Sequence, residues 1–396
     1  MAGVLSGVRV LDFGRYIAGP YCAMLLADFG AEVIRIEKRS GSEDRYQAPL
    51  NADQEGGLFL QMNRGKRGMT LNPMKAEGAE VVRRLAASAD VVLANLPEQT
   101  LKAMGLDYES LCAIKPDIIL TLVTAYGRGG PYSERVGFDG IGQAMSGSAW
   151  MTSEAEGERP FRFNAPWVDF STALHCAFGT TLALMERDKT GKGQVVEGAL
   201  LATALMVGSP LLIEQAVLSI DRVPTANRSQ TAGPADVFRT KDGWILVHVI
   251  GEPLFRRWAR LMGEEGWFSD PRFKDDISRG DNGAILSERM GRWCADRTSA
   301  EAVELLGKAM IPAAPFLKPQ ETLDDPHVRA MSFFQEVDYP GLPRPAPLSK
   351  APIFLSATPG AIGGRAPRLG EHTEEILSEL GFSQAEIAAL RASGAV

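Results

Sequence analysis

Apolar and polar stretches alternate along the first half of the chain, and this pattern predicts strands and helices in turn. Residues 8–13 (VRVLDF) predict a short buried strand, residues 19–30 (GPYCAMLLADFG) a helix, and residues 31–38 (AEVIRIEK) a second strand. Pro20 suits the first turn of that helix and Gly30 its end. Residues 81–95 and 108–127 each repeat a helix followed by a strand. This alternation predicts a mostly parallel α/β sheet with helices on both faces.

The pattern changes after residue 215, where a second, smaller domain is expected. Residues 223–238 are polar and loop-rich, and residues 236–249 predict a hairpin that turns at Asp242-Gly243. Amphipathic helices are predicted over 252–263, 284–298 and 300–310, and two more over 366–394. We therefore assign 1–215 and 335–396 to a large domain and 225–330 to a small α+β domain, with linkers at about 215–225 and 330–335.

Composition narrows the range of partners and compartments. The 396 residues are 45% hydrophobic and carry a net charge of −7, with no basic block that would suit nucleic acid. The start of the chain lacks the basic and apolar segments of a signal peptide. The longest uncharged apolar stretch, 198–213, is too short for a bilayer and predicts a buried helix that ends at Gly208-Ser209-Pro210. We expect a cytoplasmic protein without membrane partners.

Metal and thiol chemistry lack the necessary residue patterns. The four cysteines and four histidines are scattered, without the spacing of metal ligands, and reduced thiols are expected. The sequence contains no G-x-S-x-G motif, which would indicate a serine nucleophile. The candidate chemistry that remains is that of carboxylates, together with binding of anions.

A dinucleotide site is suggested by one residue and opposed by a whole loop. Glu37 ends the second predicted strand, where a dinucleotide fold places the acid that binds ribose. The first turn, from Gly14 to Pro20, lacks G-x-G-x-x-G, and its bulky Arg15, Tyr16 and Ile17 would obstruct a diphosphate. A nicotinamide or flavin enzyme is therefore disfavoured.

Two basic segments lie near predicted strand ends. Lys38 and Arg39 follow the second strand, and a second segment holds Arg64, Lys66, Arg67 and Lys75 within twelve residues. Ligands of open α/β sheets bind at the carboxyl ends of the strands, so both segments would suit a ligand with several phosphates. Solvated charged loops explain the same pattern, and composition alone favours that interpretation.

Asp169 is the only charged residue from Asn164 to Met185. A carboxylate in apolar surroundings must be paired, hydrogen-bonded or used in function. It could cap the helix predicted to begin at Phe170, because Asp is a favoured N-cap, or it could be a catalytic group.

Several segments resemble the class III CoA-transferases, a family that includes formyl-CoA transferase and carnitine CoA-transferase and is related to the α-methylacyl-CoA racemases. The resembling segments run in order through nearly the whole chain: residues 7–38, 63–78, 105–147, 188–200 and 366–381. The resemblance implies a Rossmann-like large domain, a small domain and two ring-like subunits interlocked as a homodimer. It also implies an enzyme that moves CoA from an acyl-CoA to a carboxylic acid. CoA is then a substrate, and no cofactor is bound permanently.

The resemblance also assigns roles to individual residues. Asp169 matches the family's nucleophile, which forms an acyl anhydride and then an aspartyl-CoA thioester. Arg39 matches the arginine that meets the 3′-phosphate of CoA, and further CoA-binding positions are Leu71, Lys75, Asn95, Leu96 and Lys102. Tyr16, Ile17 and Phe138 are expected in the substrate pocket, with Trp150 and Met151 as further candidates, and no residue is assigned to a metal.

Some positions depart from the formyl-CoA transferase pattern. Ile17 replaces a glutamine, Ala103 replaces an arginine, and residues 95–99 read NLPEQ. These changes speak against formate and oxalate as substrates, and neither the donor nor the acceptor can be identified from the residues.

The related racemases remain the alternative function. They carry a histidine where this chain has Phe138, and a racemase needs a base on each face of the α-carbon. Because a phenyl ring moves no proton, a transferase is favoured over a racemase. His175, six residues after Asp169, is expected to lie in the core and not to substitute as a base.

Overall fold

The computed structural model describes residues 3–53 and 55–396, which form two compact units. The first unit comprises the chain up to residue 146 together with residues 163–210 and 330–396. The second comprises residues 147–162 and 211–329. Residues 147–162, which the sequence interpretation placed in the large domain, thus group with the second unit.

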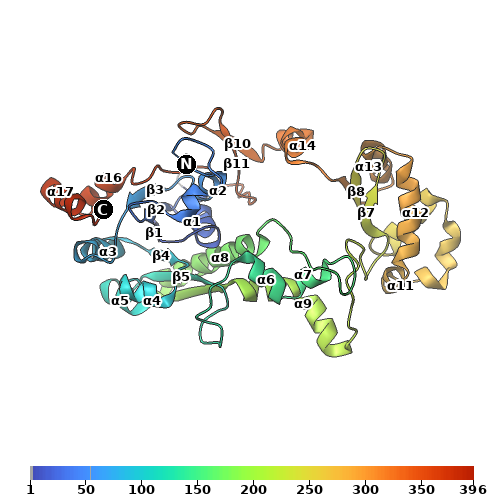
Figure 1. The fold of residues 1–396 in the computed structure, drawn as a ribbon, viewed down its shortest axis with the longest axis horizontal. Coiled ribbons are helices and arrows are strands. Elements are labelled where there is room, and N and C mark those ends of the chain that lie inside the picture. The colour runs from blue at the N-terminus through green and yellow to red at the C-terminus, as the bar shows by residue number, and fades with distance from the viewer. Residues whose placement is uncertain (1–2, 54) are drawn as a thin grey trace. The chain divides into compact units, whose positions relative to one another are not determined.

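A six-stranded parallel sheet forms the centre of the first unit (Figure 1). Its order is β3-β2-β1-β4-β5-β6, and every neighbouring pair is parallel. The mixed α/β fold with a parallel sheet is therefore confirmed. The strands are β1 (Arg9–Asp12), β2 (Glu32–Glu37), β3 (Arg67–Thr70), β4 (Val91–Ala94), β5 (Ile119–Thr124) and β6 (Val195–Ala199).

Helices cover both faces of this sheet, because alternate strand residues are apolar on both sides. Val10 contributes to the core beneath α1 (Ala18–Asp28) and α8 (Trp167–Thr190), whereas its neighbour Leu11 contributes to the opposite core. That second core is covered by α3 (Ala76–Ser88), α5 (Tyr108–Ile114), α16 (Thr373–Glu379) and α17 (Gln384–Ser393). The C-terminal helices α16 and α17 thus belong to the first unit.

Shorter elements complete the first unit. They are η1 (Glu43–Tyr46), α2 (Gly57–Met62), α4 (Glu98–Ala103), α6 (Asp139–Met145) and the antiparallel pair β10 (Phe334–Val337) and β11 (Ala346–Ser349). Tyr339 and Leu348 pack with Phe59 and Leu60 of α2 in a small separate core.

Helix α9 (Leu200–Leu218) differs from the helix predicted for this stretch. The expected stop at Pro210 is wrong, because the helix continues through this proline to Leu218. The expected burial is also wrong, since only 22% of its most apolar window is buried. By length and composition α9 could cross a membrane, but one such helix is weak evidence for a membrane protein.

The second unit contains a three-stranded antiparallel sheet packed against helices. Strands β7 (Ala235–Arg239) and β8 (Trp244–His248) form the hairpin predicted at Asp242-Gly243, and β9 (Ala313–Pro315) pairs with β8. Trp258 and Leu286 lie in its core. Its helices are α7 (Ser148–Met151), α10 (Glu252–Met262), η2 (Glu265–Ser269), η3 (Pro271–Phe273), α11 (Asp276–Asp281), α12 (Gly283–Ala295), α13 (Ser299–Lys308) and α14 (Pro319–Asp324), and α15 (Pro326–Ala330) follows.

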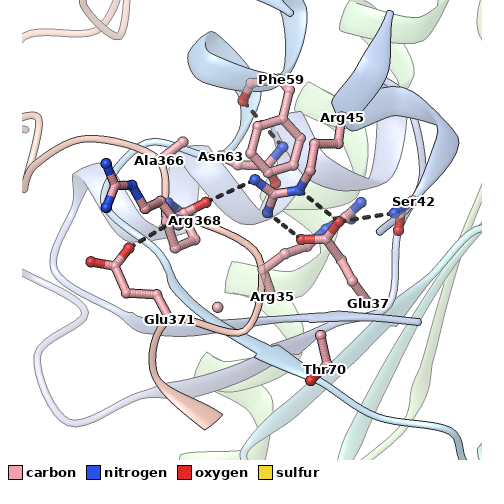
Figure 2. Close-up of polar contacts among 12 residues, drawn as sticks. Arg35, Glu37, Ser42, Arg45, Phe59, Asn63, Thr70, Ala366, Arg368 and Glu371 are labelled. Atoms are coloured by element: carbon pink, nitrogen blue, oxygen red, sulfur yellow. Dashed lines mark hydrogen bonds and ion pairs between the residues drawn. The ribbon is translucent and has the colours of Figure 1, made fainter. Parts of the chain in front are cut away.

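Buried ion pairs hold the loops at the carboxyl ends of the first strands. Arg45 lies between Glu37 of β2 and Glu55, at 2.6 Å and 2.7 Å, and all three side chains are buried. Figure 2 shows the pair of Arg45 and Glu37. Its guanidinium also donates to the Pro367 carbonyl at 3.1 Å and stacks 3.9 Å from the centre of the Phe59 ring. The loop after β2 is thereby joined to α2 and to the segment that leads to α16.

Replacing Arg45 by alanine should lower the free energy of unfolding by about 3–5 kcal/mol, because Glu37 and Glu55 would stay buried without their cation. The matched control is Arg83→Ala, whose exposed pair with Glu80 lies on α3 and should contribute little to stability. Urea unfolding measures both effects. Equal losses in the two variants would contradict the structural role given to Arg45.

Candidate active site

The loops after β1 and β4 meet where the strand order of the sheet reverses, the usual ligand-binding place of such folds. Asn95, directly after β4, holds the loop after β1 by two hydrogen bonds. Its Oδ1 accepts from the Arg15 amide at 2.7 Å, and its Nδ2 donates to the Arg15 carbonyl at 2.9 Å. The next residue, Tyr16, has a φ of 61°, a strained value for a bulky side chain. Asn95 therefore helps to hold the backbone of this loop in its conformation.

Two of the predicted substrate-pocket residues are in direct contact. The rings of Tyr16 and Phe138 meet edge to face with centroids 5.4 Å apart, and Phe138 is 61% exposed. Ile17 is buried and precedes α1, one turn before Tyr21. The Tyr21 ring contacts the Phe170 ring at 4.8 Å, which places the start of α1 beside the start of α8 and Asp169.

Asp169 lies in the first turn of α8, the third residue of a helix that begins at Trp167. The expectation that it could cap a helix starting at Phe170 is wrong, because another acid fills that role. Asp139 Oδ1 accepts from the amides of Val168 at 2.7 Å and Asp169 at 3.2 Å. The side chain that satisfies this helix end thus comes from the start of α6, thirty residues earlier.

The Asp169 carboxylate has no cation beside it. The side chain is only 9% exposed, and it makes no hydrogen bond or ion pair with the residues that the structure describes. Burial, and next the charge of Asp139, raise the pKa of Asp169 to about 7. A carboxyl group with such a pKa in a mostly buried place is typical of functional sites.

Sequence reasoning missed Asp139, although it used the neighbouring Phe138. Asp139 is buried, and besides capping α8 it accepts from Gln143 Nε2 at 2.5 Å. The signal was its place directly after Phe138 in Gly137-Phe138-Asp139, the motif that separates transferases from racemases.

A cavity of about 650 Å³ lies at the carboxyl ends of β1 and β2. Four predicted CoA-binding residues line it: Arg39, Leu71, Lys75 and Leu96. Arg39 and Lys75 converge on Gly394 at the end of α17, where an added Cβ would lie 2.8 Å from Arg39 Nη1 and 3.5 Å from Lys75 Nζ. The φ of Gly394 is 75°. Both this left-handed conformation and the close approach of Arg39 favour glycine at this position.

The structure places the other two predicted CoA-binding residues outside the lining of this cavity. Asn95 uses its side-chain amide on Arg15, as described above. Lys102 lies on α4 with its side chain 64% exposed and 3.6 Å from Glu98, while Thr100 and Met104 of the same segment line the cavity. Residues of the lining that the sequence did not suggest include Arg15 and Ser393.

Most of the second basic segment is structural. Arg64 pairs with Asp28 and Lys66 with Asp12, each at 2.7 Å and each buried. Arg67 belongs to β3, a strand that the sequence did not predict, and it pairs with Glu32, Glu375 and Glu379. Burial lowers the pKa of Lys66 to about 8, although the Asp12 carboxylate opposes this shift. The interpretation of these three as phosphate-binding or solvated residues is therefore wrong, and only Lys75 faces the cavity.

Two further residues of the sequence analysis, Glu37 and His175, are placed by the structure. Glu37 is not free to bind a ribose, because Arg45 and the Ser42 amide occupy its carboxylate (Figure 2). His175 is exposed on α8, so its expected place in the core is wrong.

Trp150 and Met151, the further candidates for the substrate pocket, belong to the second unit. Among the described residues no group of histidine, cysteine and acidic side chains could hold a metal ion.

Comparisons with known proteins identify the family. The sequence model of CoA-transferase family III matches residues 5–373. The chain belongs to CoA-transferase family III. It is 33% identical to the succinyl-CoA–L-malate CoA-transferase beta subunit of Chloroflexus aurantiacus over 98% of this chain and 96% of that protein. It is 32% identical to formyl-CoA:oxalate CoA-transferase of Bradyrhizobium diazoefficiens over 100% and 98%.

A solved structure agrees with this assignment. The chain is similar to a CAIB/BAIF family protein from Brucella suis, with a TM-score of 0.83 and 29% identity over 96% of this chain and 100% of that one. The CoA-transferase family III enzymes act on CoA thioesters and carry no permanent cofactor, so CoA enters as substrate.

The pKa of Asp169 predicts how stability depends on pH. An unfolded Asp ionises near pH 3.8, whereas the folded Asp169 keeps its proton up to about pH 7. Its contribution to stability is fully present below pH 4 and is lost as the pH rises through 7. Asp169→Asn should therefore stabilise the protein by an amount that grows between pH 4 and 7 and levels off on the order of 4 kcal/mol.

Thermal unfolding of both proteins across this pH range tests the prediction. The control is Asp188→Asn on the same helix, whose side chain is 77% exposed and should give no such growth. A stability difference for Asp169→Asn that stays flat with pH would show that the carboxyl ionises normally.

Proposed function

We propose that this chain transfers CoA from an acyl-CoA donor to a carboxylic acid acceptor, with Asp169 as the covalent carrier. The observation that carries the proposal is the Asp169 carboxylate, which is mostly buried and has no cation or hydrogen-bond donor among the described residues. Such a group is costly to keep in a folded protein unless it serves in function. Membership of CoA-transferase family III supports the same chemistry.

The proposed reaction has four steps. A carboxylate oxygen of Asp169 attacks the thioester carbonyl carbon, the C–S bond breaks, and a mixed anhydride and CoA thiolate result. The thiolate attacks Cγ of Asp169 and releases the donor's acid, which leaves an aspartyl-CoA thioester. The acceptor carboxylate then attacks Cγ and expels the thiolate, forming a second anhydride. Attack of the thiolate on the acceptor's acyl carbon yields the new acyl-CoA and frees Asp169.

The surroundings of Asp169 suit this role. A carboxylate with a pKa near 7 is a stronger nucleophile than an ordinary solvated one, and it is still ionised in a large part of the molecules at neutral pH. Trp167 and Val168 precede it, and Phe170 with the Tyr21 ring follows. Apolar neighbours of this kind keep water away from a reactive anhydride.

The acids named for the relatives guide the choice of substrates. The similar proteins are named for succinyl-CoA with malate and for formyl-CoA with oxalate. In this chain the ring pair of Tyr16 and Phe138 presents apolar surface near the start of α8, and Ile17 is an apolar residue buried beside Tyr16. We propose an acceptor that is a carboxylic acid less polar than oxalate, and a cytoplasmic enzyme.

A racemase is the second candidate, and one observation disfavours it. The family's racemases need a histidine at the position of Phe138, and the phenyl ring found there contacts Tyr16 and cannot exchange a proton. Transfer therefore remains the better-supported activity.

Asp169→Ala should abolish CoA transfer while leaving CoA binding within a fewfold of the wild type, because only the covalent step is lost. Incubation of the wild type with succinyl-CoA and hydroxylamine should add the mass of a hydroxamate to the peptide that contains Asp169. The kcat/KM of the wild type should rise with pH to a plateau, with an apparent pKa near 7.

The control for trapping is the same treatment of Asp169→Ala. An active wild type whose peptide stays unmodified would contradict the covalent route. Rapid deuterium uptake at the α-carbon of a 2-methylacyl-CoA, without any acceptor acid, would instead favour the racemase.

We further propose that the chain is a homodimer, with the interlocked subunits that the resemblance implies. One face of α8 supports an interface, because it exposes a line of large apolar side chains at helical spacing. These residues are 45–62% exposed: Leu174, Phe178, Leu182 and Met185. A continuous apolar line of this kind is typical of a surface that another protein covers, and a second copy is always present at equal concentration.

Phe178→Glu should destabilise the dimer by placing a charge in its apolar interface. Light scattering after size exclusion is expected to give twice the chain mass of 42.8 kDa for the wild type and a shift toward one chain for the variant. The control is Lys189→Glu, near the end of the same helix, with a side chain 70% exposed. A monomeric wild type would overturn the proposal.

A further inference from the structure

Three cations line the cavity without a carboxylate partner. Arg15, Arg39 and Lys75 make no ion pair with residues 3–53 or 55–396. The other charges of the lining are neutralised, since Lys38 pairs with Glu43 and Glu37 with Arg45. Three unneutralised cations around one cavity favour a ligand with several negative charges.

Arg39 and Lys75 lie together, whereas Arg15 is held elsewhere in the wall. Both Arg39 and Lys75 reach Gly394, and the Lys75 ammonium donates to the Ser393 carbonyl. Arg15 belongs to the loop after β1 and directly precedes Tyr16 and Ile17, the residues nearest along the chain to the start of α1. The cavity thus has a basic end at α17 and a further cation where β1 and β2 end, since the Arg15 guanidinium contacts the carbonyls of Phe13 and Ile36.

The Arg15 guanidinium is anchored through one of its nitrogens and leaves the others available. Nη1 donates to the carbonyls of Phe13 at 3.0 Å and Gly14 at 2.8 Å, and more distantly to that of Ile36 at 3.4 Å. Nη2 and Nε have no acceptor among the described residues, and neither is a buried orphan. Three N–H donors therefore remain for a ligand.

The surroundings of Arg15 are short of negative charge. Burial, and next the neighbouring Arg35 guanidinium, lower the pKa of Arg15, while Asp44, Asp12 and Glu37 act against this. All three of these acids are already paired, Asp12 with Lys66, Asp44 with Arg35 and Glu37 with Arg45. An anion in the cavity would supply the charge that Arg15 lacks.

We propose that Arg15 binds the diphosphate of the CoA substrate, positioned by the two hydrogen bonds from Asn95 to its backbone. CoA carries its diphosphate between the 3′-phosphate and the thiol. Arg15 lines the cavity from the loop between β1 and α1, and the start of α1 lies beside the start of α8 with Asp169. The assignment rests on the proposed function, because it takes CoA as the ligand. It gives Arg15 a role separate from that of Arg39.

Calorimetric titration with CoA and with 3′-dephospho-CoA separates the two arginines. Both ligands contain the diphosphate, so Arg15→Ala should weaken the binding of each by the same factor, about tenfold to a hundredfold. Arg39→Ala should weaken CoA more than 3′-dephospho-CoA. Arg83→Ala, on the exposed face of α3, is the matched control and should change neither affinity.

Each result decides the assignment. Unchanged binding of 3′-dephospho-CoA by Arg15→Ala, or a loss confined to CoA, would overturn it. If Arg15→Ala also lowers the unfolding midpoint, Arg15→Lys decides, since it keeps the charge: recovery of most of the affinity supports the proposal, and no recovery overturns it. A wild-type protein that binds neither ligand would instead remove the proposed function itself.

Discussion

The ion pair between Asp12 and Lys66 holds together the part of the fold on which the candidate site depends. Asp12 ends β1, and its two oxygens accept from the Lys66 ammonium at 2.7 Å and from the Gly14 amide at 2.8 Å. Lys66 also donates to the Pro20 carbonyl at 2.9 Å. One buried contact thus fixes the end of β1, the first turn of α1 and the approach to β3. The loop with Arg15, Tyr16 and Ile17 lies between these fixed points.

Buried carboxylates of the first unit differ in what compensates their charge. One kind is buried and has a basic partner inside the protein that neutralises its charge, as in Asp12, Asp28 and Glu37. Asp169 is also mostly buried, yet it has no basic partner and has an acid nearby. The same physical rule, that a buried charge needs compensation, explains the first kind as structural and makes the second the candidate for catalysis.

The sequence predicts the alternating elements well and predicts long-range pairing poorly. The strands at 8–13 and 31–38 and the hairpin at Asp242-Gly243 are visible because their apolar periodicity is local. Strand β3 was hidden because it is short and begins with Arg67. Arg64 and Lys66 looked like ligand-binding residues because their acids, Asp28 and Asp12, are 36 and 54 positions away in sequence. Asp139 was missed for the same reason, since the helix that it caps begins far downstream.

The charge of Asp139 affects the free energy that a covalent bond to the Asp169 carboxyl group would cost. The Asp139 carboxylate that caps α8 and the Asp169 carboxylate lie at the same helix end. When both are ionised, the positive end of the α8 dipole stabilises two negative charges that repel each other. In the proposed reaction, an acyl or thioester bond on Asp169 would remove one of these charges and leave the helix dipole to the Asp139 cap alone. The repulsion between the two carboxylates would thereby be relieved, so the covalent state would cost less free energy than at an ordinary carboxyl group.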